Sequence, residues 1–248
     1  MRTSPLSVTP RLTELPLVAA LFALAAIGWF VTGHRMSGMD AGPGTDPGTL
    51  GFFLVTWVVM MGAMMFPSVA PMVVAYERIR AHRREIGKPA PAWGTAVFVS
   101  GYLASWVAFG LVGWAVYEGV RGLSIDALAW HRGGRYVAGG VILLAAVYEL
   151  TPLKHACLRK CRTPMSFLFG GWRDGSLGAF RLGVGHGAWC VGCCWALMAA
   201  LFALGVMSVP WMAFIGALIA AEKLLPWARG PSIAISVLLA VLAVLTAT

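Results

Sequence analysis

The chain has 248 residues, of which 59% are hydrophobic and only 12% are charged. Soluble domains carry about 25% charged residues, so this composition excludes an ordinary soluble protein and predicts an integral membrane protein. Seven spans of roughly twenty residues each would use more than half of the chain, which leaves no room for a large soluble catalytic domain. Residues 1–248 are therefore predicted to form a single membrane domain.

Apolar runs bounded by charged residues, Pro or Gly predict an all-α polytopic bundle of about seven transmembrane helices. The predicted spans are residues 15–32, 50–75, 92–117, 136–150, 186–207, 211–225 and 231–247. The fourth span is short and carries Glu149 near its end. A bundle of six spans is therefore the alternative.

The Lys and Arg residues of the connectors predict the orientation, because basic connectors stay on the cytoplasmic side. With the N-terminus inside, the outer segments hold only four of the nineteen basic residues, namely Arg35, Arg121, Arg132 and Arg135. The formal net charge of +9 then follows mainly from topology, with attraction to anionic lipid as a by-product. The bilayer is the expected partner, and no nucleic-acid partner is predicted.

A cluster of soft donor atoms begins the fifth predicted span. His186, Cys190, Cys193, Cys194 and Met198 are three or four residues apart, so a helix places them on one stripe. Imidazole, thiolate and thioether together select a soft metal, above all Cu(I), with zinc or iron as alternatives. The competing interpretation is that Cys and Met only fill space in the helix bundle.

A second cluster consists of methionines in the second predicted span. Met60 and Met64 form one i,i+4 pair, Met61 and Met65 form another, and Pro67 follows them. Thioethers bind Cu(I) without losing a proton, and Pro67 should bend the helix and free backbone carbonyls nearby. A methionine stripe taken alone is more often core packing. It gains weight as a metal path only if this span faces the cysteines.

The third cluster follows the fourth predicted span and contains His155, Cys157 and Cys161. The two cysteines are four residues apart, as on one turn of a helix. With His155 they would form a site for capturing metal on the cytoplasmic side, and their basic neighbours favour the thiolate form. A basic connector with two reduced thiols is the alternative. In the predicted topology all five cysteines lie on one side of the membrane.

Two acidic residues, Glu149 and Glu222, lie near the ends of predicted spans. A buried charge in a membrane is costly, so each is a candidate for metal binding or proton transfer. The more economical expectation is that they pair with Lys154 and Lys223 at the headgroup boundary. The chain has no phosphate-binding loop and no recognisable hydrolase triad, which disfavours an ATP-driven pump or a hydrolase.

Four motifs occur together between about residues 50 and 225: Trp57-x-x-Met60-Met61-x-x-Met64-Met65-x-Pro67, Thr151-Pro-Leu-Lys154-x-x-Cys157-Leu-x-x-Cys161-Arg, Cys190-x-x-Cys193-Cys194-x-x-Leu-Met198, and Trp211-Met212 followed by Glu222-Lys223. In this combination the chain resembles a family of predicted metal-binding integral membrane proteins, domain of unknown function 2182. The resemblance implies a multi-pass protein of the bacterial inner (cytoplasmic) membrane that binds metal and is sometimes described as a copper chaperone. It does not identify the metal.

Three hypotheses follow. In the first, the protein holds Cu(I) and hands it to a cuproprotein or an assembling oxidase: the third cluster captures copper, the cysteine cluster binds it, and the methionines form a low-affinity path. In the second, it is a membrane thiol–disulfide oxidoreductase in which Cys190 and Cys193 cycle. In the third, it is a non-catalytic scaffold subunit. The sequence predicts no catalytic residues, and it leaves the oligomeric state and the direction of transfer open.

Overall fold

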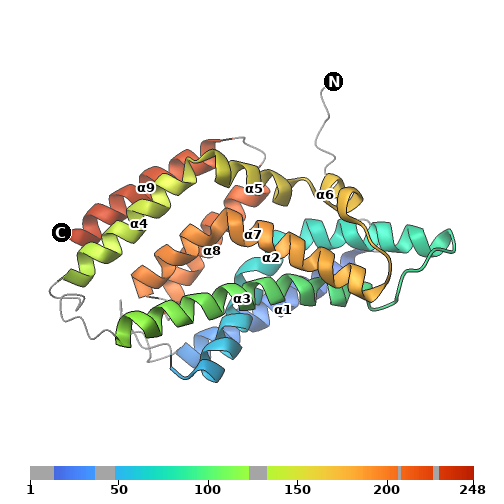
Figure 1. Ribbon diagram of the computed structural model, residues 1–248, viewed down its shortest axis with the longest axis horizontal. Coiled ribbons are helices and arrows are strands. Elements are labelled where there is room, and N and C mark those ends of the chain that lie inside the picture. The colour runs from blue at the N-terminus through green and yellow to red at the C-terminus, as the bar shows by residue number, and fades with distance from the viewer. Residues whose placement is uncertain (1–13, 37–47, 123–132, 206–207, 226–228) are drawn as a thin grey trace.

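The computed structural model describes residues 14–36, 48–122, 133–205, 208–225 and 229–248. Within these ranges the chain forms helices joined by short connectors, without strands (Figure 1). The helices are α1 (Leu15–Met36), α2 (Leu50–Glu85), α3 (Gly94–Gly122), α4 (Arg135–Glu149), α5 (Pro152–Arg162), α6 (Pro164–Gly171), α7 (Gly175–Gly205), α8 (Val209–Leu224) and α9 (Gly230–Ala247). The predicted all-α bundle is confirmed.

Five of these helices, α1, α2, α3, α7 and α9, are long and apolar enough to cross a membrane. The pair α4 and α5, bent by 66° at its junction, makes a sixth candidate if it is one broken span. α8 has 16 residues, about 24 Å of helix against a hydrocarbon core of about 30 Å. The count of seven spans and the orientation with the N-terminus inside stay predictions.

Two predicted helix boundaries were wrong. α2 continues past residue 75 to Glu85. Its last turns are charged, and in them Arg80 pairs with Glu77, one turn earlier, at 2.6 Å. α7 begins at Gly175 rather than at residue 186. Its first turns are rich in glycine and include Arg181, so they resemble a connector in sequence. In the structure they pack against α3.

Small residues bring α3 and α7 into close contact. A Cβ atom at Gly183 would collide with the carbonyl oxygen of Phe98, and one at Gly187 would lie 2.7 Å from the Ser105 side chain. Close approach of this kind is how helices associate in lipid, where no hydrophobic force drives them together. The α3–α7 contact fixes the side chains of α3 against the cysteine-bearing stretch of α7.

The remaining helices surround this pair. α1 packs along α2, α4 packs along α9, and α5 packs on α7, while α3 and α8 each contact both α2 and α7 (Figure 1). α2 is the most buried of the candidate spans. Large apolar side chains stay exposed on α1, α4 and α9, among them Phe22, Phe30, Leu144, Val237 and Val241. Such faces suit contact with lipid tails.

Candidate metal centre

The three cysteines of α7 form a compact group of sulfur atoms in the protein interior. The Sγ atoms of Cys190, Cys193 and Cys194 all lie within 4.8 Å of one another, and each residue is 1% exposed. They converge because positions i, i+3 and i+4 share one face of a helix. Cys193 and Cys194 both donate their S–H to the carbonyl oxygen of Cys190, at 3.1 and 2.8 Å.

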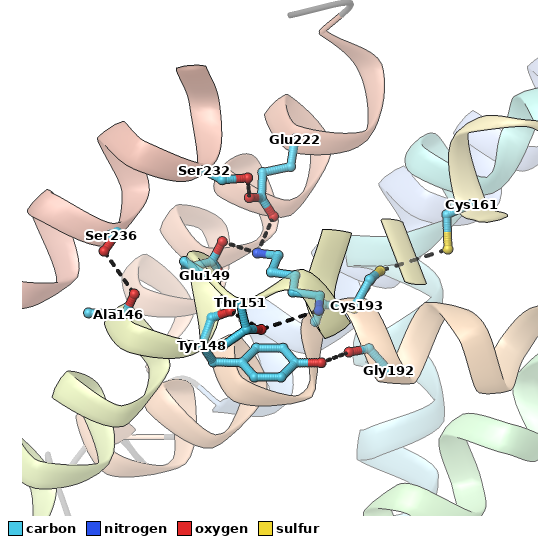
Figure 2. Close-up of polar contacts among 12 residues, drawn as sticks. Ala146, Tyr148, Glu149, Thr151, Cys161, Gly192, Cys193, Glu222, Ser232 and Ser236 are labelled. Atoms are coloured by element: carbon cyan, nitrogen blue, oxygen red, sulfur yellow. Dashed lines mark hydrogen bonds and ion pairs between the residues drawn. The ribbon is translucent and has the colours of Figure 1, made fainter. Parts of the chain in front are cut away.

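A fourth sulfur comes from α5. Cys161 Sγ lies 3.8 Å from Cys193 Sγ (Figure 2). Cys193 Sγ lies in turn 4.0 Å from Cys194 Sγ. The five cysteines are all free thiols. Cys161 is only partly buried, unlike the three on α7. The cluster therefore reaches towards the surface through Cys161.

These spacings fit a bound soft metal. A metal–sulfur bond of about 2.3 Å places two bound sulfurs about 3.8 Å apart in tetrahedral geometry and about 4.6 Å apart in linear geometry. The sulfurs described above span the same range. Thiolates with no carboxylate among them favour Cu(I) or zinc over hard cations. The group can thus accept a metal with small side-chain movements.

Gly192 allows α5 to approach α7 closely enough for this arrangement. A Cβ atom at that position would lie 3.0 Å from the Sγ atom of Cys157, which is itself buried. The backbone carbonyl of Gly192 also accepts a hydrogen bond from the hydroxyl of Tyr148 on α4 (Figure 2). Both contacts hold the α4–α5 corner against α7, and they place Cys161 beside Cys193.

Cys190 has two polar partners from other helices. Lys223 Nζ on α8 lies 2.9 Å from Cys190 Sγ, and the hydroxyl of Tyr102 on α3 lies 3.2 Å from the same atom. An ammonium group in contact with a buried sulfur stabilises that sulfur as a thiolate, the form that binds metal. Lys223 therefore supplies the positive charge that a buried anionic site needs.

His186 lies one turn before Cys190 on the same face of α7, as predicted. Its ring is enclosed by Phe98, Tyr102 and Phe167, with ring centroids 5.4 to 6.3 Å away. It is 3% exposed, and within the described part of the chain its Nδ1 atom has no hydrogen-bond partner. An imidazole nitrogen buried without a partner is unusual and is chemically able to bind a metal.

The methionines are buried in the same core but on different helices. Met60, Met61, Met64 and Met65 of α2 are each at most 3% exposed, and Met198 continues the cysteine ridge of α7 at 0%. Met64 packs close to Gly216 of α8. The two groups are thus linked through α8 and α3, which contact both α2 and α7.

The three residues of the predicted capture site do not all lie at the sulfur cluster. Cys157 and Cys161 lie on one helix, as predicted, and both face α7. His155 on the same helix is near a different set of groups, the charged side chains of Lys154, Arg162, Glu222 and Arg229. Of the three predicted residues, the structure brings Cys161 to the sulfur cluster and places Cys157 beside it.

The buried acidic residues meet a single lysine. Lys154 Nζ donates to Glu149, and it also donates to Glu222 at 2.6 Å (Figure 2). Glu222 accepts a further hydrogen bond from Ser232 at 2.8 Å. The expected pairing of Glu149 with Lys154 is confirmed, whereas the expected pairing of Glu222 with Lys223 is wrong, because Lys223 points to Cys190 instead. The carboxylates are also fully buried in the bundle.

The sequence analysis did not predict that Tyr102 belongs to the site, nor that Lys223 contacts Cys190. Consecutive residues on a helix point about 100° apart, so Glu222 and Lys223 can serve two different sites, and that periodicity was the available signal. Nothing in the local sequence marks Tyr102. Its role depends on the close contact of α3 with α7.

The chain is similar to a known protein family. A family model named PpoB2 and described as copper chaperone matches residues 54–246. No curated protein and no solved structure matches the chain. Because the matched region is well over half of the sequence and contains every cysteine, the chain belongs to this copper chaperone family.

Proposed function

We propose that this member of the copper chaperone family binds Cu(I) as cargo in the membrane, at the sulfur cluster of Cys161, Cys190, Cys193 and Cys194, and hands it to a partner protein. The observation that carries the proposal is the convergence of four thiol sulfurs from two helices at spacings that fit one soft metal ion. The membrane in question is the bacterial inner membrane.

The groups around the sulfurs support this assignment. Copper bound by two thiolates carries a net charge of −1, and Lys223 beside Cys190 neutralises that charge in an apolar interior. His186, whose Nδ1 atom has no hydrogen-bond partner among the described residues, is a further ligand one turn along α7. The partly buried Cys161 receives the metal first.

The buried methionines would form the low-affinity part of the path. Met198 is one turn beyond Cys194, and Met60, Met61, Met64 and Met65 line α2. Thioethers hold Cu(I) more weakly than thiolates do, so they suit passage rather than storage. A cuproprotein or an oxidase under assembly is the kind of partner that would accept the ion.

The test is the metal content of the purified protein. We expect full-length protein isolated anaerobically in mild detergent from copper-supplemented cells to contain at least one copper per chain by elemental mass spectrometry. The Cys190→Ser/Cys193→Ser/Cys194→Ser variant should lose it. Cys157→Ser is the matched control, since it removes a buried thiol beside the cluster, and it should keep the metal. Copper absent from wild type, or equally present in the triple variant, contradicts the proposal.

A second candidate function is thiol–disulfide exchange. It is favoured by the 3.8 Å separation of Cys161 Sγ and Cys193 Sγ across the α5–α7 contact. A small movement would bring the two sulfurs to bonding distance, and the disulfide of a partner protein would take up their two electrons and two protons as the Cys161–Cys193 bond forms. Trapping of thiols in growing cells separates the two functions. A Cys161–Cys193 disulfide that changes with the redox state of the cell supports exchange, whereas thiols that remain reduced exclude it.

A further inference from the structure

Met212 of α8 is a buried thioether that the copper site described above does not use. It follows Trp211 in one of the four motifs of the sequence, and its side chain is 0% exposed. A thioether is a soft donor with no proton to lose, and soft donors select Cu(I). The side chains that face Met212 from other helices decide whether it can act as a ligand.

α2 runs opposite to α7 and in the same direction as α8. Trp57, in the first part of α2, lies 5.6 Å between ring centroids from Phe202, near the end of α7. Tyr76, further along α2, stacks at 5.2 Å on Trp172, which precedes α7. These two contacts make α2 and α7 antiparallel. α8 turns back along α7, because only three residues separate these two helices and they pack together.

The antiparallel arrangement of α2 and α7 brings Met61 and Met198 face to face. Met61 is one turn after Trp57, and Met198 is one turn before Phe202, so each shares the face that makes the ring contact. One turn forward on α2 and one turn back on α7 lead to the same level. Both methionine side chains are 0% exposed.

A second pair of methionines meets across the contact of α2 with α8. Met64 of α2 lies against Gly216 of α8, where an added Cβ atom would be 3.5 Å from both its Cγ and Cε atoms. Met60 and Met212 are each one turn earlier on the same faces, and the two helices run in the same direction. Met60 and Met212 therefore lie at the same level, with exposures of 1% and 0%.

The two pairs lie side by side, since Met60 and Met61 are neighbours in the sequence. Thioethers from three helices thus gather at one level of the bundle, and the flexible methionine side chain can adjust its sulfur around an ion. Met198 is one turn beyond Cys194, so this level adjoins the sulfur cluster. All five thioethers are neutral, so a bound Cu(I) ion would keep its charge of +1 in an apolar interior, which is costly. Binding should therefore be weaker than at the thiolates.

We propose that these thioethers form a second Cu(I) site, distinct from the sulfur cluster, between α2, α7 and α8. Its ligands come from Met60, Met61, Met64, Met198 and Met212. An ion that leaves the cluster reaches it by exchanging a bond to Cys194 for a bond to Met198, and the released thiolate takes up a proton from water. No electron is transferred. Only this passage from the cluster rests on the proposed function, whereas binding of Cu(I) by the thioethers does not.

The experiment marks the thioethers with selenium. Full-length protein that contains selenomethionine is loaded anaerobically in detergent with an excess of the Cu(I)–acetonitrile complex, because the weaker site fills only when copper is added. X-ray absorption at the copper edge then distinguishes selenium neighbours, from methionine, from sulfur neighbours, from cysteine. We expect the Cys161→Ser/Cys190→Ser/Cys193→Ser/Cys194→Ser variant to bind copper with selenium neighbours.

Replacing one thioether on each helix tests the assignment of the ligands. Adding Met61→Leu, Met198→Leu and Met212→Leu to the four-serine variant should abolish the selenium neighbours, and these exchanges conserve volume, so the core should tolerate them. Met36→Leu is the matched control, because Met36 is a buried methionine of α1 outside both pairs, and it should leave the spectrum unchanged. Selenium neighbours that persist without Met61, Met198 and Met212 overturn the assignment.

The same spectra separate the second site from the proposed function. Copper with sulfur but no selenium neighbours in wild type, and none with selenium in the four-serine variant, overturns the second site and leaves the sulfur cluster standing. Selenium neighbours in the four-serine variant, with as much copper as in wild type, contradict the sulfur cluster and support the second site. Should the four-serine variant not fold, wild type with excess copper decides: selenium neighbours support the site, and their absence overturns it.

Discussion

Lys223 offers the sharpest single-residue test of the copper site, because it contacts Cys190 Sγ at 2.9 Å from another helix. In Lys223→Met the side chain keeps most of its length but loses its charge. Cys190 then holds a proton that copper must displace, and the anionic copper–thiolate complex loses its counter-charge. A hydrogen bond to a charged group contributes about 1.5–3 kcal/mol. Since 1.4 kcal/mol is tenfold in affinity, we expect Cu(I) binding to weaken about ten- to a hundredfold.

The assay is competition with a chromophoric Cu(I) chelator under anaerobic conditions. Lys160→Met is the matched control, because Lys160 is an exposed lysine on α5, and its affinity should equal that of wild type. Lys223→Arg should keep part of the affinity, since it restores the charge with a different shape. A folded Lys223→Met protein that binds copper as tightly as wild type would refute the role given to this charge.

Two further predictions concern glycines of α7. Gly183→Ala places a methyl group against the carbonyl oxygen of Phe98 and should destabilise the protein by about 1–3 kcal/mol. Gly185→Ala, whose nearest neighbouring atom lies at 3.7 Å, should leave the stability unchanged. Denaturant titration in detergent compares the two variants, and equal unfolding midpoints would contradict the α3–α7 contact. Gly192→Ala places a methyl group 3.0 Å from Cys157 Sγ and should push α5 away from α7. The variant should then retain less copper in the competition assay. Unchanged retention would show that Cys161 is not needed.

The sequence predicted the helical bundle and the grouping of the α7 cysteines on one face well, because both depend on local patterns. Long apolar runs have few alternatives to membrane helices, and cysteines at positions i, i+3 and i+4 must share a face of any helix that contains them. The proximity of the Sγ atoms of Cys190, Cys193 and Cys194, within 4.8 Å of one another, follows from that spacing.

The contacts between helices could not be predicted in the same way. The approach of Cys161 to Cys193 depends on Gly192, whose missing side chain makes room for Cys157, and glycine alone does not indicate which helix will approach. The partners of Glu222 and Lys223 were assigned by proximity in sequence, whereas the helix turns these side chains towards two different sites. The start of α7 was missed because packing against α3, rather than apolar character, keeps its first turns helical.

The most direct test of the central claim is X-ray absorption spectroscopy at the copper edge on the anaerobically loaded protein. We expect monovalent copper with sulfur as its dominant neighbour, and we expect Cys193→Ser to change the number of sulfur ligands. Copper surrounded mainly by oxygen and nitrogen, or a spectrum unchanged by Cys193→Ser, would contradict binding at the sulfur cluster.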